Sequence, residues 1–323
     1  HRHRRIDLNL KLQAVRAFIE QGDDFLLTTH VNSDADGLSA CMALARLLRG
    51  LGKRADIGLP DPPAEQCYFL EDWPDVRHYT DLDLSGYGSA IIVDCPSLDR
   101  IGSVRENLPS GIRILNIDHH HGNDNFGEIN LAEDISSTCE LVYHLVAGLG
   151  YEIDAAMATQ LYTGIIFDTG SFRFSPTKPS TFAVAGALVQ LGVQLDYIAD
   201  HVFADKSFGS VKQLGLAINS MQLHLADRVA VLHLDREGMQ AGDPNEVVNY
   251  GLMVKSVEVA VLLKEQDPGL YRVSLRSRDT VDVSAVAGLF GGGGHARASG
   301  LRIEGEVSEI TTKILAEIGR YLA

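Results

Sequence analysis

The segment Phe25-Leu-Leu-Thr-Thr-His30-Val-Asn-Ser-Asp34-Ala-Asp36 is an apolar run that stops at side chains able to bind a metal ion. Directly behind it, the segment Gly37–Leu51 has apolar residues at the three- and four-residue spacing of a helix. This part of the chain is therefore predicted to be a buried strand, a polar loop and a helix.

Similar runs recur along the chain. Ala90-Ile-Ile-Val-Asp94 again ends in a carboxylate, and Ile112–Asp118 leads directly into three adjacent histidines at positions 119–121. A fourth run, Leu161–Phe167, meets Asp168. Because the preceding residues are rich in alanine, this last run fits a helix as well as a strand.

Continuous apolar strands that alternate with helices are typical of a parallel sheet with helices on both faces. Ligands of such sheets bind at the carboxyl ends of the strands. Side chains placed there also avoid the cost of burying a charge without a partner. We therefore expect six side chains to meet at that edge: His30, Asp34, Asp36, Asp94, His119 and Asp168.

The length of 323 residues and the apolar content of 45% suit about two domains. We expect an α/β protein with a catalytic domain over 1–191, a linker helix region over 192–221 and a smaller mixed α/β domain over 222–323. The second domain should have strands at Val229–Leu234, Val257–Leu263 and Tyr271–Arg276, and helices near 283–289 and 308–322.

Composition excludes several classes of protein. The formal net charge of -15 argues against capture of long nucleic acid on a basic face, although most of the 43 acidic residues would serve solubility.

No apolar run approaches the ~18 residues of a membrane span, and His1–Arg5 lacks a secretory signal. The four cysteines have no C-x-x-C spacing and are expected to be buried thiols. We expect a cytoplasmic protein with no membrane partner.

Two imidazoles and four carboxylates form a ligand set for two divalent metal ions. The mixture of nitrogen and oxygen donors suits Mn²⁺ best, and it leaves Mg²⁺, Fe²⁺ or Co²⁺ open, with zinc not dismissed. Two such ions lower the pKa of a shared water and screen charge on a phosphoryl group. The sequence therefore predicts a metal-dependent phosphohydrolase.

Each part of the set also has a purely structural interpretation. Asp36 could cap the helix that follows it, Asp94 could be a turn residue before Pro96, and Asp168 could begin a turn. The three histidines could be a solvated loop or a stray metal site. Only the joint pattern favours a metal centre.

The ordered motifs resemble the DHH phosphoesterases, and the glycine-rich segment near the C-terminus resembles their associated C-terminal domain. The resemblance covers nearly the whole chain, and it is nearest to the branch of standalone nanoRNases that also act as 3′-phosphoadenosine 5′-phosphate phosphatases. It rests on His30-Val-Asn-Ser-Asp-Ala-Asp36, Asp94, Asp118-His-His120, Asp168-Thr-Gly170 and Gly291-Gly-Gly-Gly-His295, with support from Asp94–Gly102, Ser136–Glu140 and Asp168–Arg173.

The resemblance implies a role for each of these residues. His30 and Asp34 would hold one metal ion, the second would be held by Asp36, His119 and Asp168, and Asp94 would bridge both. His120 would face the scissile phosphate, where it could stabilise the transition state or protonate the leaving ribose oxygen. Asp118 would orient a histidine, and His121 is expected to be solvent-exposed.

The segment Phe290–Gly300 holds four consecutive glycines, whose backbone N–H groups could approach an anion closely. Nearby basic side chains favour a phosphate clamp over the alternative, a flexible hinge or tight turn. The active site is then expected in the cleft between the domains. The substrate-binding residues would be His120, Arg276, Gly293, Gly294, His295, Arg297 and Ser299.

The predicted activity is hydrolysis of short oligoribonucleotides and of 3′-phosphoadenosine 5′-phosphate. A cyclic-dinucleotide or linear-dinucleotide phosphodiesterase is the alternative enzyme, and a catalytically silent nucleotide sensor is the alternative outside enzymes. Pyrophosphatase, exopolyphosphatase and processive single-strand exonuclease activities are disfavoured. The expected partner is a short oligonucleotide or nucleotide, with no long nucleic acid, and a homodimer is left open.

Overall fold

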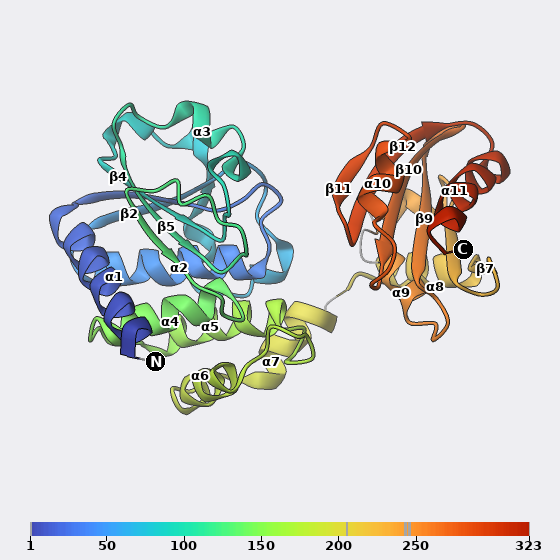
Figure 1. Cartoon of the computed structure of the whole chain (residues 1–323). Coiled ribbons are helices and arrows are strands. Elements are labelled where there is room, and N and C mark those ends of the chain that lie inside the picture. Colours follow the sequence, from blue (N-terminus) through green and yellow to red (C-terminus); the bar gives the residue numbers. More distant parts are fainter. Residues whose placement is uncertain (1, 205, 242–243, 245–246, 323) are drawn as a thin grey trace. The chain divides into compact units, whose positions relative to one another are not determined.

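The computed structural model describes residues 2–204, 206–241, 244 and 247–322. The chain folds as two compact units, His1–Asp205 and Lys206–Ala323 (Figure 1). The division between the two units falls within the segment 192–221, which the sequence predicts to be a linker helix region.

The first unit is built on a six-stranded sheet in the order β3-β2-β1-β4-β5-β6. All neighbouring strands in it are parallel. The order reverses between β1 and β4, which is where an open parallel sheet leaves a crevice for ligands. The strands are β1 (Asp24–Thr28), β2 (Arg54–Leu59), β3 (Val76–His78), β4 (Ser89–Val93), β5 (Arg113–Asp118) and β6 (Ile129–Ala132).

Side chains along the strands alternate between two buried clusters, which explains why the apolar runs are continuous. In β1, Phe25 and Leu27 join the cluster on one face, whereas Leu26 joins the cluster on the other. On the first face lie α1 (Arg2–Gln21), α2 (Ala35–Gly50) and α4 (Thr138–Gly148). The helices α5 (Ala155–Asp168) and α6 (Pro179–Gln190) pack against these helices, with α6 further from the sheet (Figure 1).

The opposite face is covered by short elements. They are α3 (Val104–Asn107) and the 3-10 turns Tyr79–Asp81, Leu84–Gly86 and Leu98–Ile101, with further turns at Glu65–Cys67 and Trp73–Asp75 elsewhere in the unit. The prediction of a parallel sheet with helices on both faces is confirmed, although one face has mainly single turns. The long helix α1 has no counterpart in the sequence prediction.

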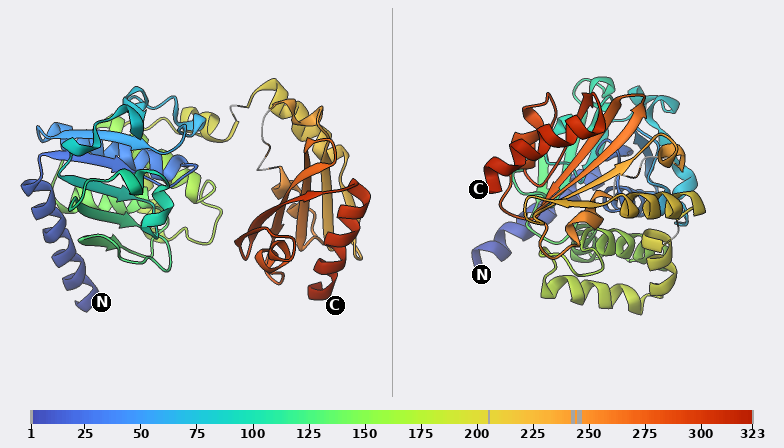
Figure 2. Two further views of the ribbon diagram at one scale, coloured as in Figure 1. Left: turned by 90° about the horizontal axis from the view of Figure 1, so that it is seen from above. Right: turned by 90° about the vertical axis from the view of Figure 1, so that its right-hand side faces the viewer.

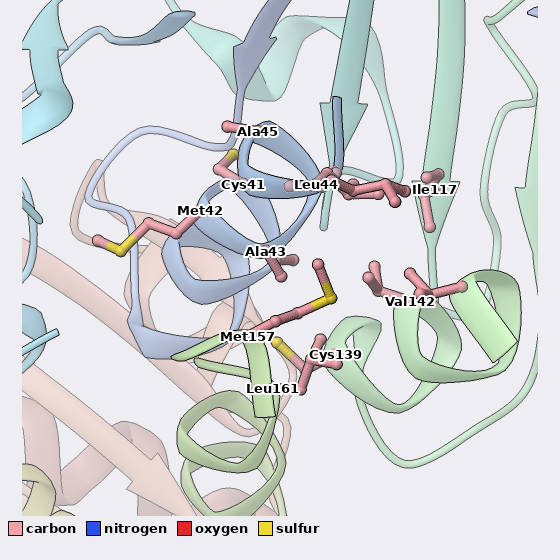
Figure 3. Packing of buried hydrophobic residues seen from close by; sticks show 14 of the residues in the cluster. Cys41, Met42, Ala43, Leu44, Ala45, Ile117, Cys139, Val142, Met157 and Leu161 are labelled. Atoms are coloured by element: carbon pink, nitrogen blue, oxygen red, sulfur yellow. The ribbon is translucent and has the colours of Figure 1, made fainter. Parts of the chain in front are cut away.

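The ambiguous run Leu161–Phe167 belongs to helix α5. Asp154 caps this helix by accepting the N–H of Met157 at 2.8 Å. The helix is apolar around most of its circumference because it is buried against α2, α4 and α6. Figure 3 shows Met157 and Leu161 beside Ala43 of α2 and Cys139 of α4.

Three helical segments follow α6: α7 (Leu195–Ala199), the π-helix Asp200–Ala204 and α8 (Phe208–Asn219). No single described helix is long and apolar enough to cross a membrane, and only the pair Pro179–Gln190 and Leu195–Ala204, bent by 119°, meets that criterion together.

The second unit holds a mixed sheet in the order β11-β12-β10-β9-β8-β7. Only β8 and β9 are parallel among the paired strands that the structure describes. The predicted mixed α/β architecture is confirmed. Its elements are β7 (Gln222–His224), β8 (Val229–Leu234), a turn at Gly238–Ala241, α9 (Val248–Leu252), β9 (Val259–Asp267), β10 (Leu270–Ser277), α10 (Val283–Gly288), β11 (Gly293–His295), β12 (Ala298–Glu304) and α11 (Val307–Leu322).

The two faces of this sheet have separate cores. Helices α10 and α11 pack in one cluster, and α8 and α9 pack in the other. The right-hand view of Figure 2 shows α11 and α8 on opposite sides of the strands.

Candidate metal centre

The loop after β1 places the first two candidate ligands. The Nε2 atom of His30 lies 3.6 Å from Asp34 Oδ2 and 3.4 Å from Asp94 Oδ2. The other oxygen of Asp34 caps α2, because it accepts the N–H groups of Asp36 and Gly37 at 3.0 and 3.1 Å. The helix cap is therefore Asp34 and not Asp36, and the carboxylate of Asp36 is left for another role.

Asp36 is fully buried and is held from the start of α4. Its Oδ2 atom accepts the backbone N–H of Thr138 at 2.7 Å, and its Oδ1 atom accepts that of Cys139 at 2.9 Å. A Cβ on Gly164 of α5 would lie 2.6 Å from Asp36 Oδ1, so the helix must have glycine where it passes this carboxylate.

Asp94 lies at the centre of the group, at the end of β4. Its φ of 58° is left-handed, a conformation that aspartate tolerates better than most residues. Its Oδ2 atom faces His30, while its Oδ1 atom lies 3.4 Å from His119 Nε2 and accepts the hydroxyl of Thr138 at 2.9 Å. One carboxylate thus faces an imidazole with each oxygen.

His119 and Asp168 complete the arrangement from the ends of β5 and α5. Their Nε2 and Oδ2 atoms are 3.0 Å apart. His119 Nδ1 lies 3.3 Å from the carbonyl oxygen of Ile135. Asp168 therefore reaches the site from a helix, and not from a strand.

Three groups of side chains bring ligand atoms within 4.8 Å of one another. They are His30 with Asp34 and Asp94, Asp36 with His119 and Asp168, and Asp94 with His119 and His120. The first two groups contain all six residues that the sequence singles out as metal ligands. Oxygen and imidazole donors in this number suit two divalent cations.

The electrostatics of the site also favour cations. Burial raises the pKa of Asp36, and the charges of Asp168 and Asp94 raise it further. Burial raises the pKa of Asp168 to about 6. Although burial opposes ionisation of Asp94, hydrogen bonds from His119 and His30 hold its pKa below its usual value. A divalent ion would relieve the repulsion among these crowded carboxylates.

When they are protonated, the imidazoles of His30 and His119 are positive charges among the carboxylates. Burial disfavours their charge, but the carboxylates of Asp34 and Asp94 outweigh it and raise the pKa of His30 to about 10. Asp168 and Asp94 likewise outweigh burial and raise the pKa of His119 to about 12. Metal binding must displace these protons, because a ligand histidine is neutral.

His120 is oriented by a buried carboxylate beside the group. Its Nδ1 atom lies 2.7 Å from Oδ1 of Asp118, and Asp118 Oδ2 accepts the side-chain N–H of Asn123 at 2.6 Å. With Nδ1 occupied, Nε2 is the ring nitrogen that can reach a ligand. His121 is 87% exposed, which confirms the expectation for that residue.

The sequence prediction gave no role to the residues that support the site, although Ser136–Glu140 is one of the stretches that carry the family resemblance. These residues are Asn123, Thr138, Cys139, Glu140 and Gly164. One signal was available in Ser137-Thr-Cys-Glu140, which has the spacing of a helix N-terminus. Ser137 accepts the N–H of Glu140 at 3.0 Å, and α4 begins there. The buried Glu140 accepts the hydroxyls of Ser136 and Thr181 and so ties the start of α4 to α6.

In the second unit, most of the predicted clamp residues lie on the adjacent strands β10, β12 and β11, and Arg297 lies in the turn between β11 and β12. Arg276 of β10 and His295 of β11 both pair in register with Ala298 of β12. Burial lowers the pKa of Arg276. The guanidinium of Arg297 donates to the carbonyl of Val281 at 2.9 Å.

The last two glycines of the run, Gly293 and Gly294, lie in strand β11, where they pair with Gly300 and Ser299. A Cβ on Gly294 would lie 2.6 Å from the carbonyl oxygen of Ala298, so close pairing of the two strands itself requires glycine there. The hydroxyl of Ser299 donates to the carbonyl of Val283 at 2.6 Å and is thereby part of the packing.

Known proteins match both units. The model of the DHH family, N-terminal domain, matches residues 24–165, and that of the DHHA1 domain matches residues 226–323. The chain is 31% identical over 283 residues to the bifunctional oligoribonuclease and PAP phosphatase NrnA of Thermus thermophilus, covering 86% of this chain and 84% of that protein. It is 26% identical over 305 residues to NrnA of Bacillus subtilis, covering 91% and 93%.

One solved structure has nearly the same fold over the whole chain. An exopolyphosphatase-related protein from Bacteroides fragilis matches with a TM-score of 0.89 at 24% identity, covering 97% of this chain and 96% of that one. At this identity the likeness establishes the fold.

Proposed function

The chain belongs to the DHH family of phosphoesterases and carries a DHHA1 domain, and from this premise we propose that it hydrolyses phosphate esters of short oligoribonucleotides and of 3′-phosphoadenosine 5′-phosphate. One observation supports metal-dependent hydrolysis most strongly: the carboxylate of Asp94 lies between two imidazoles, with His30 near one oxygen and His119 near the other. The substrate class is supported by the relatives from Thermus thermophilus and Bacillus subtilis, which are named for both activities.

The donor set supports a site for two divalent ions, and Mn²⁺ suits its mixture of nitrogen and oxygen best, with Mg²⁺, Fe²⁺ or Co²⁺ as alternatives. His30, Asp34 and Asp94 would hold one ion, and Asp94 would share the second with Asp36, His119 and Asp168. When bound, the ions would lower the pKa of a water and stabilise charge on the phosphoryl oxygens.

The chain's own residues have distinct tasks in this proposal. His120, fixed through Nδ1 by Asp118, presents Nε2 to the substrate. There it donates a hydrogen bond to a phosphoryl oxygen or a proton to the leaving ribose oxygen. The backbone of Thr138 and Cys139 keeps the carboxylate of Asp36 in a single orientation, so that no rearrangement is needed on binding.

In the second unit, Arg276, His295 and Arg297 are proposed to bind the substrate's non-scissile phosphate, with Gly293, Gly294 and Ser299 shaping that surface. Support comes from the register that brings Arg276 and His295 to the same point of β12. A guanidinium is well suited to a phosphate because it donates two parallel hydrogen bonds.

The proposal also places the protein in the cytoplasm with small substrates. All four cysteines are free and buried, as expected where thiols stay reduced. The net charge of -15 is unfavourable for binding long nucleic acid.

The test is turnover with Mn²⁺ of 3′-phosphoadenosine 5′-phosphate, RNA of two to five residues, cyclic di-AMP, pyrophosphate and a long DNA strand. Cleavage of the first two substrates only is the expected result. Dominant cleavage of any of the other three would contradict the proposed substrate class while leaving the metal chemistry in place.

A further inference from the structure

The turn that follows α5 has a backbone conformation that is rare for L-amino acids. Gly170, Ser171 and Phe172 have φ angles of 54°, 58° and 64°, all in the left-handed region. Glycine takes this conformation freely, whereas it is unusual for a bulky residue such as phenylalanine. Strained residues persist only where the surrounding structure holds them, and they cluster at functional sites. Here they begin two positions after the candidate ligand Asp168.

The turn is closed by hydrogen bonds to the residue beside that ligand. The carbonyl of the buried Thr169 accepts the backbone N–H groups of Arg173 and Phe174, both at 2.9 Å. The hydroxyl of Thr169 accepts the N–H of Phe172 at 3.1 Å. These bonds bring Arg173 and Phe174 back to the start of the turn, so both residues lie near Asp168.

The two phenylalanines of the turn have different surroundings. Phe172 stacks on Phe182, with ring centroids 5.0 Å apart, and contacts Tyr162 edge-on, so it packs against the core. The ring of Phe174 lies on Gly170, where a Cβ would be 2.4 Å from it, and Phe174 is 53% exposed. Phe174 therefore has aromatic surface available to a ligand.

Arg173 places an exposed cation beside this ring. Its Nε atom donates to the carbonyl of Gly170 at 2.7 Å, and its guanidinium carbon lies 6.0 Å from the ring centroid of Phe174. Within the described part of the chain, its two terminal nitrogens make no hydrogen bond or ion pair. Because these nitrogens can only donate, a ligand that binds them must offer acceptors.

We propose that Phe174 and Arg173 bind the nucleobase of the substrate beside the metal centre. The base stacks on the ring of Phe174, and the guanidinium of Arg173 donates to the ring-nitrogen or carbonyl acceptors of the same base. Stacking of this kind accepts any base, because every base has a π-face. The inference rests on the proposed function, since it assigns a site to the base of the nucleotide whose phosphate ester is cleaved.

The test is calorimetric titration of the full chain, in the presence of Mn²⁺, with adenosine 5′-monophosphate and with ribose 5-phosphate, which lacks the base. Wild type should bind the nucleotide more tightly by a factor of about five or more. Phe174→Leu and Arg173→Gln should each weaken binding of the nucleotide and leave that of the sugar phosphate unchanged, while Phe174→Tyr should behave as wild type. Phe208→Leu is the matched control with wild-type affinities, because Phe208 is also exposed and has the cation of Lys212 near its ring.

Two further measurements distinguish contact with the base from support of the turn. The Mn²⁺ affinity of each variant should equal that of wild type, because a distorted turn would displace Asp168. Fluorine NMR of the chain labelled with 4-fluorophenylalanine needs a variant only for assignment. The signal of Phe174 should shift with the nucleotide and not with the sugar phosphate, and that of Phe208 should shift with neither.

The proposal is overturned if wild type binds the two ligands equally, if Phe174→Leu weakens both alike or lowers Mn²⁺ affinity, or if the Phe174 signal does not respond to the nucleotide. Turnover of 3′-phosphoadenosine 5′-phosphate reports separately on the proposed function. Base-dependent binding without turnover would contradict the activity and keep the base site. Turnover without base-dependent binding would contradict the base site alone.

Discussion

The hydroxyl of Thr138 donates a hydrogen bond of 2.9 Å to Oδ1 of Asp94, while the backbone N–H of the same residue binds Asp36 at 2.7 Å. One residue at the start of α4 thus holds two candidate metal ligands, one from the first turn of α2 and one from the end of β4. The metal centre therefore depends on α4 as much as on the strands that carry its ligands.

Thr138→Val removes the hydroxyl and keeps the shape of the side chain. Because partners behind a metal ligand typically account for about 10–100-fold in affinity, we expect Mn²⁺ affinity to fall by that factor. Calorimetric titration with Mn²⁺ measures it. Thr159→Val is the control, because the half-buried Thr159 of α5 donates its hydroxyl to the carbonyl of Ala155 and to no candidate ligand. Equal affinities in the two variants would contradict this role of Thr138.

Asp94→Asn preserves the size of the central side chain and removes its charge. We expect kcat/KM on short RNA to fall by more than about 10²-fold, since a shared ligand should matter more than its supporting contacts. The fold should survive, as judged by circular dichroism. The exposed Asp124→Asn should have wild-type turnover, and an active Asp94→Asn enzyme would remove this residue from the centre.

Gly164→Ala tests the close approach of α5 to the site. Its new methyl group would meet Asp36 Oδ1 and the sulfur of Cys139, so we expect a loss of about 1–3 kcal/mol in the free energy of unfolding. Gly186→Ala is the matched control in α6. Its Cβ meets nothing within 4 Å, so the change should stabilise the protein by about 0.5–1 kcal/mol. Urea denaturation distinguishes the two, and equal effects would show that the space around Gly164 is not limiting.

Arg297→Ala tests the proposed substrate clamp. A residue that binds the substrate and its transition state equally well affects KM while leaving kcat almost unchanged. Steady-state kinetics on 3′-phosphoadenosine 5′-phosphate should therefore show a higher KM. A fall in kcat alone would instead place Arg297 in the stabilisation of the transition state.

The lowered pKa of Glu140 makes the free energy of unfolding depend on pH in the acid range. Burial opposes the charge of Glu140, yet the nearby imidazole of His144 and hydrogen bonds from Ser136 and Thr181 lower its pKa from 4.5 to about 2. A pKa that is lower in the folded state contributes stability above the unfolded value, and this contribution is lost as the pH falls from 4.5 towards 2. The stability advantage of wild type over Glu140→Gln in urea should shrink across this range. An advantage that is constant with pH would contradict the linkage.

The strands and their polar ends could be predicted because buried parallel strands are short and continuously apolar. β1, β4 and β5 all end where the sequence changes from apolar to polar. The sequence could not show whether Leu161–Phe167 is a helix or a strand, since a fully buried helix and a buried strand are both apolar throughout. Its neighbours α2 and α4, and not its own pattern, make α5 a helix.

The supporting contacts were beyond sequence reasoning for a similar reason. Asp36 and Thr138 are 102 positions apart, and the contact uses a backbone N–H that carries no sequence signal. Gly164 resembles an ordinary helix residue until α2 is packed against it. The sequence therefore indicates which residues are chemically suited to a metal, while the geometry shows what holds them in place.

The most direct test of the metal centre is a crystal structure of the protein grown with Mn²⁺, with data collected at the manganese absorption edge. Two anomalous peaks about 3.5–4 Å apart are expected, with Asp94 between them. One peak, no peak, or peaks away from Asp94 would contradict the assignment of His30, Asp34, Asp36, Asp94, His119 and Asp168 to a two-metal site.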